Sequence, residues 1–431
     1  MGRALFRGFL SDSTAGSPRG VWSGGGFVAW DRLLEAGRSL DVGVRPGGAY
    51  LVDPTSPVEA LTAFFAVATV PDTVLIWAAR AAFPGETQQL APALHAVPWP
   101  GDPVNRPLWG IMTSGSSGVP KLPVGYADTL EAVAVHYDAA VFRPTFAGAE
   151  TALATCLPLQ FSAAFFMSVL PSLLFRRDLV VFAPHDWRPV VEAAQRDHVI
   201  CQAVPAVTAA GSLSVPEQVD MSRAAVIMGA GYVTEQRVRT IRSRFRDVRL
   251  ANIYGTAETG AVSLDRDPGA NRHVGRPLPG KPVWLVEADA NGTGRVATTG
   301  PDCMRFRWTP GLPLEPMGDV VTGTDYGHFD AEGNLYLDGR VDGGEKLHGV
   351  TIYPRRIERH ILDLDGVVDV RVLVRHRPDS ADELTARVIG DVGVDQVREH
   401  CAALSAIERP NRVECFTEAE SVSAYTAHGK L

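Results

Sequence analysis

Short apolar strands that alternate with helical segments are the feature that most limits how this chain can fold. Strands are predicted at residues 50–53 and 74–77. Between them, Ser56 at the N-cap, Pro57 in the first turn and Glu59 in a capping box predict the start of a helix. A strand, a helix and a second strand in this order predict two parallel neighbours in a buried sheet.

The same alternation continues along the chain. Residues 11–26, rich in serine and glycine, are predicted to form a loop. Further strands are predicted at residues 108–112, 179–182, 224–228 and 250–253, and helices at residues 27–36, 126–142, 190–196 and 235–245. With 431 residues and 45% hydrophobic content, the chain can bury one substantial core and a smaller one.

The pattern changes near Arg340, where a small α+β unit begins. Helices are predicted there at residues 355–362 and 396–404, and strands at residues 367–375, 384–389 and 412–416. The predicted fold class is therefore α/β. We expect a large N-terminal domain of stacked, parallel-rich sheets with helices at residues 1–338, joined by a hinge to a small C-terminal α+β domain at residues 339–431.

Composition excludes some classes of function. A formal net charge of −8 argues against a nucleic-acid binder. The five cysteines have no metal-ligand spacing, and Arg3 and Arg7 interrupt the apolar start, so a cytoplasmic protein without a signal peptide is expected. Residues 151–175 carry no charge and are long enough to span a bilayer, but Pro158 and Pro171 favour a buried strand followed by a buried helix.

The loop at residues 113–121 has the composition of an anion-binding site. Its backbone N–H groups can turn inward around a phosphate while hydroxyls and one lysine add donors and charge. It is not a Walker A loop, because Pro120 precedes the lysine and Leu122 follows it. Serine and glycine loops are often linkers, but the predicted strand before this one and the helix behind it favour a site. Its candidate residues are Thr113, Ser114, Gly115, Ser116, Ser117, Gly118 and Lys121.

A second candidate segment, residues 252–260, follows a predicted strand, at the edge where open α/β sheets bind ligands. Tyr254 can stack on a flat base, and the Glu258 carboxylate can hold a magnesium ion that bridges phosphates. Taken singly, a core tyrosine and a solvated glutamate are the more common interpretations.

Together these segments resemble signatures of the adenylate-forming superfamily, which contains acyl-CoA and aryl-CoA ligases, peptide-synthetase adenylation domains and luciferases. Residues 113–121 resemble its phosphate-binding loop, and residues 254–258 its Tyr-Gly-x-Thr-Glu motif. Residues 228–231 resemble its Gly-Gly-Ala turn beside the adenine. The resemblance covers residues 45–431 and, besides the loop, implies nucleotide contacts at Gly229, Ala230, Tyr254, Gly255, Thr256, Asp325 and Arg340.

The C-terminal signatures follow in the family's order. Asp325 resembles the aspartate that accepts hydrogen bonds from both ribose hydroxyls, and Arg340 the arginine that holds the ribose or phosphates. Residues 339–349 resemble the family's hinge, with Asp342 as pivot and Lys346 entering the site when the last domain rotates. Lys430 alone would indicate a frayed terminus. Here it resembles the final lysine, which spans the carboxylate and the α-phosphate during adenylation.

This chain departs from the family in two places. Ala257 stands where the family has a threonine that contacts the α-phosphate, and Thr256 is the candidate substitute. The family's first segment is largely missing. That shortness, with residues 349–358, looks most like the compact phenylacetate-CoA ligase branch.

The resemblance implies activation of a small carboxylic acid by ATP and Mg²⁺ as an acyl-adenylate, with release of pyrophosphate. Lys430, Glu258 and Lys346 would be catalytic and Glu258 the metal ligand. The acceptor would be a thiol, either CoA or the phosphopantetheine of an acyl carrier protein. The alternatives are transfer to an amine or other nucleophile, and a non-catalytic nucleotide-binding relative. Neither a nucleic acid nor a membrane is expected as partner.

The acid itself is predicted to lack a free α-amino group. Adenylation domains for α-amino acids place an aspartate where Ser162 stands, and residues 151–175 contain no acidic side chain. An unpaired buried ammonium would be unfavourable. An aryl or medium acyl group is therefore expected, bound by Phe161, Ser162, Phe165, Phe166, Met228 and Gly229.

Overall fold

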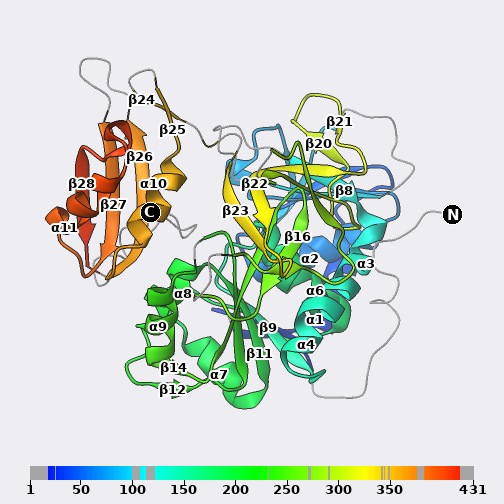
Figure 1. Ribbon diagram of the computed structural model, residues 1–431. Coiled ribbons are helices and arrows are strands. Elements are labelled where there is room, and N and C mark those ends of the chain that lie inside the picture. The colour runs from blue at the N-terminus through cyan, green and yellow to red at the C-terminus, as the bar shows by residue number, and fades with distance from the viewer. Residues whose placement is uncertain are drawn as a thin grey trace.

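The computed structural model describes residues 18–24, 26–99, 107–112, 122–231, 233–269, 273–289, 292–340, 343, 345–347, 350–375 and 383–417. Two large mixed sheets with helices between and beside them form most of the molecule (Figure 1). A four-stranded antiparallel sheet and a small C-terminal unit complete the described part. The predicted α/β fold class is confirmed.

The first sheet has nine strands in the order β17-β16-β15-β13-β11-β9-β10-β1-β2. In that order they are Arg276–Pro277, Gly260–Asp265, Arg249–Thr256, Ala224–Met228, His198–Ala203, Thr151–Thr155, Leu179–Val181, Gly20–Ser23 and Gly26–Ala29. All neighbours from β15 to β1 pair in parallel, and the strands at both edges are antiparallel. The predicted parallel arrangement thus holds in the middle of the sheet.

The second sheet has eight strands in the order β21-β20-β8-β7-β4-β3-β6-β5. In that order they are Glu315–Pro316, Phe306–Trp308, Leu122–Tyr126, Leu108–Ile111, Val74–Trp77, Ala49–Val52, Leu94–Ala96 and Gln88–Ala91. Strands β3 and β4 are parallel because helix α2 (Pro57–Ala68) connects them. Ser56 caps α2 by position, but its side chain makes no capping hydrogen bond, so the predicted capping box does not form.

Helices fill the space between the two large sheets. The largest buried cluster joins apolar residues of both sheets to α2, α3 (Leu130–Tyr137) and α6 (Leu170–Phe175). A second buried cluster covers the other face of the nine-stranded sheet with α7 (Arg188–Arg196), α8 (Pro205–Ser212) and α9 (Glu235–Arg244). Both faces of this sheet are therefore buried, as its near-continuous apolar strands require.

Three predictions near the N-terminus and around α3 were wrong. Residues 20–23 form strand β1 instead of a loop, and residues 27–29 belong to β2, so helix α1 begins later (Trp30–Arg38). The helix expected at residues 126–142 is divided into a 3-10 turn (Ala127–Thr129), α3 and a π-helical segment (Asp138–Phe142), followed by the short helix α4 (Arg143–Thr145). Strand β8 extends to Tyr126, which displaces the predicted start of the helix.

The uncharged run at residues 151–175 forms a strand and a helix, as expected. Strand β9 is followed by α5 (Ser162–Ala164), a π-helical segment (Phe165–Val169) and α6. Among the described residues, no helix has the length and apolar character needed to cross a membrane.

The four-stranded antiparallel sheet had no counterpart in the sequence prediction. It consists of β18 (Val283–Val286), β19 (Gly294–Thr298), β22 (Val321–Phe329) and β23 (Leu335–Arg340), in that order. Buried and half-buried positions alternate along β22, but the buried ones include Gly323, Asp325 and Gly327. The strand therefore lacks the alternation of apolar and polar residues by which a strand is predicted. The predicted domain boundary at residue 339 falls inside β23.

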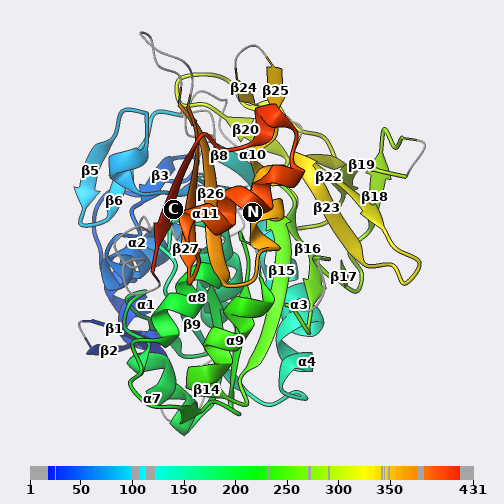
Figure 2. The ribbon, with the colours of Figure 1, turned by 60° about the vertical axis from the view of Figure 1, so that its left-hand side comes forward.

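The C-terminal unit closely follows the prediction. Helices α10 (Pro354–Leu362) and α11 (Val394–His400) pack with the sheet of β26 (Val367–Arg375), β27 (Glu383–Gly390) and β28 (Arg412–Phe416) around a separate core. A hairpin of β24 (Glu345–Leu347) and β25 (Val350–Ile352) precedes them. Figure 2 shows this unit lying over α9.

Candidate functional site

Two of the residues that are predicted to bind the nucleotide are in direct contact with each other. The hydroxyl of Tyr254, near the C-terminal end of β15, donates a hydrogen bond of 2.9 Å to Oδ2 of Asp325 on β22. Asp325 is 7% exposed, whereas Tyr254 is half-buried. The contact joins the nine-stranded sheet to the four-stranded sheet at the edge where α/β sheets bind ligands.

The backbone of a third predicted residue, Arg340, lies at the same place because of the strand register. Residue 340 ends β23 and is the cross-strand partner of Asp325 on β22. Residues directly opposite each other in an antiparallel pair have neighbouring Cα atoms. The fold therefore brings together residues 254, 325 and 340 from three separate segments.

The turn after β13 lies beside β15. Met228, the last residue of β13, pairs with Asn252, and the amide of Gly229 donates to the Ala203 carbonyl at 3.2 Å. A Cβ at residue 229 would lie 3.0 Å from the carbonyl oxygen of Ile253, which explains the glycine. The next residue, Ala230, has a φ of 61° and is exposed, so the turn presents backbone next to the Tyr254 strand.

Thr256 is engaged inside the β15–β16 turn. Its Oγ1 accepts hydrogen bonds from the amides of Glu258 (3.3 Å) and Thr259 (3.2 Å). The Oγ1 atoms of Thr256 and Thr259 lie 3.1 Å apart, and Thr259 Oγ1 also accepts from the Thr256 amide at 3.0 Å. The two hydroxyls thus organise the turn. A contact from Thr256 to a phosphate, expected as a substitute at Ala257, requires that part of this bonding be given up.

Glu258 lies at the middle of the same turn with its backbone fixed on both sides. Its amide donates to Thr256 Oγ1, and its carbonyl accepts from the amide of Met304 at 2.9 Å. The side chain is half-buried, and within the described part of the chain nothing donates a hydrogen bond to its carboxylate. That carboxylate is therefore available for a ligand.

The Glu258 carboxylate suits a magnesium ion that is bound mainly by nucleotide phosphates, and not a metal site built from protein ligands alone. No group of three or more histidine, cysteine, aspartate or glutamate side chains that could hold an ion occurs among the described residues. Mg²⁺ at nucleotide sites is held by one or two carboxylates together with phosphate oxygens and water. A single available glutamate in a turn beside the Tyr254 strand matches that pattern.

A buried charged network beneath the turn escaped the sequence prediction. Lys281 Nζ donates to the carbonyl of Thr259 at 2.7 Å and forms an ion pair with Asp302, whose other oxygen accepts from the Tyr137 hydroxyl at 2.7 Å. The side chains of Lys281 and Asp302 are 1% and 0% exposed. Burial and the Asp302 carboxylate raise the pKa of Tyr137 well above its ordinary value, so the hydroxyl stays protonated and donates. Lys281 stands between Gly280 and Pro282, which gave it the appearance of a loop lysine.

The predicted acid-binding residues divide into two groups. Phe161 and Ser162, at the start of α5, are half-buried, whereas Phe165 and Phe166 are 1% and 3% exposed. The ring centroid of Trp109 lies 6.0 Å from that of Phe165 and 4.9 Å from that of Phe166. The two buried rings therefore belong to an aromatic cluster between the sheets, and Phe161 and Ser162 are the accessible members.

Met228 lies apart from that aromatic cluster. Successive residues of a strand point to opposite faces, and Ile227 packs in the core that contains Phe165 while Met228 packs in the core on the α7–α9 side. Met228 is fully buried there. Met228 and Phe165 therefore pack in different cores, on opposite faces of the nine-stranded sheet.

Several predicted site residues lie outside the described residues, so their roles stay predictions. They are the whole loop with Thr113, Ser114, Gly115, Ser116, Ser117, Gly118 and Lys121, the pivot Asp342, and Lys430. The backbone of Lys346 is described as the middle of β24.

The C-terminal unit is attached to the N-terminal part by polar contacts, some buried and one exposed. Arg237 of α9, 1% exposed, forms an ion pair with Asp369 of β26, and Arg239 lies 3.9 Å from Asp365. Arg359 of α10 donates to the carbonyl of Leu337 in β23.

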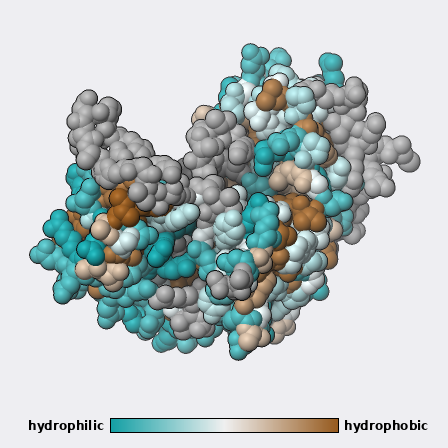
Figure 3. Space-filling model, turned by 45° about the horizontal axis from the view of Figure 1, so that its top comes forward, coloured by the Kyte–Doolittle hydropathy of each residue, from teal (hydrophilic) through white to brown (hydrophobic). Residues whose placement is uncertain are grey.

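On the face shown in Figure 3, hydrophilic residues predominate and apolar residues form small groups.

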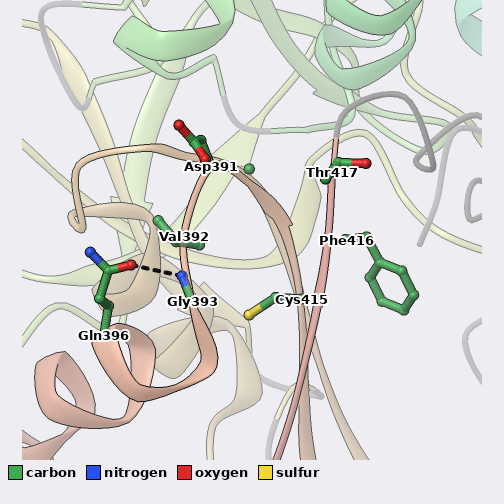
Figure 4. A pocket seen from close by; sticks show the side chains of 8 residues that line it. Asp391, Val392, Gly393, Gln396, Cys415, Phe416 and Thr417 are labelled. Carbon is green, nitrogen blue, oxygen red and sulfur yellow. Dashed lines mark hydrogen bonds between the residues drawn. The ribbon is translucent and has the colours of Figure 1, made fainter.

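A hollow of about 310 Å³ lies in the C-terminal unit, away from the signature residues. Figure 4 shows its lining, in which the side-chain oxygen of Gln396 accepts from the Gly393 amide at 2.7 Å. The remaining residues around it are Gly390, Asp391, Val392, Cys415, Phe416 and Thr417. None of them was a predicted site residue.

The profile of one protein family, described as AMP-binding enzyme, matches residues 49–306. The chain belongs to this family. The match contains the predicted phosphate loop, the turn after β13 and the turn with Glu258.

Curated relatives are similar over part of their length. Indoleacetate--CoA ligase of Aromatoleum aromaticum is 26% identical over 250 residues, which cover 53% of this chain and 47% of that protein. The 3,4-dihydroxybenzoate--[aryl-carrier protein] ligase of Bacillus anthracis is 25% identical over 166 residues, 38% of this chain and 36% of that protein. The matched region thus spans less than half of either relative.

Solved structures share the fold over nearly the whole chain. ATP-bound MatB from Rhodopseudomonas palustris matches with a TM-score of 0.66 and 18% identity, over 96% of this chain and 95% of that one. The amide bond synthetase McbA from Marinactinospora thermotolerans matches with a TM-score of 0.61 and 21% identity, over 95% and 94%. At these identities the likeness establishes the fold.

Proposed function

We propose that this protein uses ATP and Mg²⁺ to convert a small carboxylic acid into an acyl-adenylate, releases pyrophosphate, and then transfers the acyl group to a thiol. The observation that supports this proposal is the meeting of Tyr254 and Asp325, with residue 340 in register, in a member of the AMP-binding enzyme family. Residues that resemble the family's nucleotide contacts thus lie together although they are far apart in the sequence.

In the first half-reaction the acid's carboxylate attacks the α-phosphorus of ATP, and pyrophosphate leaves. The ring of Tyr254 packs against the adenine, and Asp325 accepts hydrogen bonds from the ribose hydroxyls. A carboxylate can do so while it also accepts from Tyr254, because its two oxygens offer about four lone-pair sites. The loop at residues 113–121 holds the β- and γ-phosphates, and Lys430 stabilises the charge that develops at phosphorus.

Glu258 is the proposed ligand of magnesium. When bound, the ion neutralises phosphate charge and orients the leaving pyrophosphate. The protein otherwise acts by positioning, because no side chain needs to react covalently. The fixed backbone of Glu258 suits this task, since it leaves only side-chain rotation to be restrained on binding.

The proposed acid has no free α-amino group and is either an aryl acid or an acid with a medium-length acyl chain. Ser162 lies at the accessible start of α5, and the nearby Phe161 is also half-buried, so the polar and apolar contacts available there are uncharged. Relatives named for indoleacetate and 3,4-dihydroxybenzoate support an aryl acid.

The proposed second half-reaction delivers the acyl group to CoA or to the phosphopantetheine of a carrier protein. A relative named as an aryl-carrier-protein ligase supports the latter partner. An amine acceptor is the second candidate, since an amide bond synthetase shares the fold. A non-catalytic relative is the third, because Ala257 replaces a phosphate contact and the Thr256 hydroxyl is engaged within its turn.

Acid-dependent exchange of labelled pyrophosphate into ATP tests the first half-reaction. We expect exchange with aryl or medium-chain acids and none with the standard α-amino acids. The reverse pattern would contradict the assignment of Ser162, and no exchange with any acid would favour the non-catalytic relative. Adding CoA, a phosphopantetheinylated carrier protein or an amine to active mixtures then separates the acceptors by their products.

A further inference from the structure

The buried ammonium of Lys281 donates to three different partners. Its ammonium donates to the Thr259 carbonyl at 2.7 Å, to Asp302, and to Sγ of Cys303 at 3.6 Å. An ammonium has three donors, so all of them are used. The charge is therefore fixed in one position directly behind the turn that carries Glu258.

Asp302 extends this contact to the other side of the turn. Its second oxygen accepts from the hydroxyl of Tyr137 at 2.7 Å, and that hydroxyl accepts from the amide of Ala261 at 2.8 Å. The chain of contacts thus runs from the carbonyl of Thr259 to the amide of Ala261 and encloses Gly260. Gly260 has a φ of 64°, and a Cβ there would lie 2.2 Å from Asp302, so this network packs directly against the turn.

The network also reaches the residue next to Thr259. The amide of Met304, two positions after Asp302, donates to the carbonyl of Glu258 at 2.9 Å. The segment that carries the buried carboxylate therefore fixes the peptide after Glu258, while Lys281 fixes the peptide after Thr259. The direction in which the Glu258 side chain leaves the backbone depends on both.

We propose that Lys281, Asp302 and Tyr137 are positioning residues that aim the Glu258 carboxylate at the magnesium of the bound nucleotide. This inference rests on the proposed function. A buried ion pair can stabilise less than apolar packing of the same size, but it fixes geometry through directional hydrogen bonds. Partners that orient a metal ligand typically change metal affinity by about 10- to 100-fold when removed.

The test compares ATP binding by calorimetry in magnesium and in EDTA, without acid, so that no reaction occurs. The full chain should bind ATP more tightly in magnesium. Lys281→Met should weaken binding in magnesium by about tenfold and leave binding in EDTA within about twofold. Tyr137→Phe, which removes one hydroxyl and is the milder change, should lose part of the same magnesium-dependent gain.

Hydrogen exchange of the nucleotide-free protein gives a second readout. Amides of residues 256–261 should exchange several-fold faster in both variants, because the Thr259 carbonyl or the Ala261 amide has lost its partner. The double variant Lys281→Met with Asp302→Asn removes both buried charges, so no unpaired charge remains and the free energy of unfolding should recover relative to Lys281→Met. Its magnesium-dependent gain should stay low, which a purely stabilising role would not predict.

Asp178→Asn is the matched control. Asp178 accepts from the Gly20 amide at 2.8 Å and pairs with Arg19 at 3.1 Å, beside β10 and β1, near the opposite edge of the nine-stranded sheet from β16. This variant should lose stability and keep the full magnesium-dependent gain. Unchanged gain and unchanged amide exchange in Tyr137→Phe and in the double variant would overturn the inference. A wild-type protein that binds no ATP, or gains nothing from magnesium, would overturn the proposed function and this inference with it.

Discussion

The hydroxyl of Tyr254 lies 2.9 Å from a carboxylate oxygen of Asp325, although 71 positions separate the two residues. The contact links the end of a parallel strand in one sheet to an inward position of an antiparallel strand in another. We propose that this contact holds the adenine-packing ring and the ribose-binding carboxylate in a fixed relation before any nucleotide binds.

Replacing Tyr254 by phenylalanine tests that relation. The ring remains, but the hydrogen bond to a buried carboxylate is lost, and such a bond contributes about 1.5–3 kcal/mol. We expect roughly tenfold weaker ATP binding in Tyr254→Phe and a larger loss in Tyr254→Ala, which also removes the packing surface. Calorimetric ATP titrations measure both, and equal affinities of the phenylalanine and alanine variants would contradict a role for the ring.

Glu258→Gln keeps the size of the side chain and removes its charge. Pyrophosphate exchange should fall by about 100-fold, as for other lost transition-state contacts, with an unchanged thermal midpoint. The control Glu315→Gln changes an exposed glutamate of β21 and should retain wild-type activity. Wild-type exchange by Glu258→Gln over a range of magnesium concentrations would show that this residue is not the metal ligand.

The two ends of the C-terminal unit are predicted to serve different steps. Lys430→Ala should slow adenylate formation by about 100-fold, in line with loss of one oxyanion donor, and spare transfer from a supplied acyl-adenylate. Asp342→Pro should impair transfer more than adenylation, because proline restricts φ to near −65° at the pivot. The two steps are measured separately in each variant, and an equal loss of both steps in both proteins would refute the division.

Alkaline stability depends on a buried thiol. Burial raises the pKa of Cys156 from an ordinary 9.0 to about 12. Between these values the unfolded state loses a proton that the folded state keeps, so the stability that this thiol contributes is fully present below pH 9 and is lost as the pH rises toward about 12. Cys156→Ala should reduce the slope of the unfolding free energy against pH by about 1.4 kcal/mol per unit over that window. Urea unfolding at several pH values measures the slope, and a slope equal to wild type would contradict a raised pKa.

Elements with a plain apolar pattern could be predicted from the sequence. Strands β13, β26 and β28 have the predicted bounds, because β13 is a continuous apolar run and apolar residues recur along β26 and β28. The pattern failed where inward residues are not apolar. Strand β22 places Gly323, Asp325 and Gly327 inward, so the sheet that carries the aspartate was not predicted as a sheet.

The site was predictable only where residue type signals chemistry locally. Tyr254, Asp325 and Glu258 lie in motifs, and two of them meet in the fold. The partnership of Lys281 with Asp302 and Tyr137 depends on three segments that come together only after folding, and each residue alone resembles an ordinary loop or helix residue. Burial, which decides their role, has no local signal in the sequence.

Formation of an acyl-adenylate is tested by a single-turnover reaction with ATP labelled at the α-phosphate, enzyme in excess, magnesium and an acid that supports pyrophosphate exchange. The label should appear first in an acyl-adenylate, with one pyrophosphate released for each adenylate formed, and should move to AMP when a thiol acceptor such as CoA is added and takes the acyl group. Omission of the acid or of magnesium should abolish the signal. Label in ADP, with release of inorganic phosphate in place of pyrophosphate, would contradict attack at the α-phosphorus and with it the proposed function.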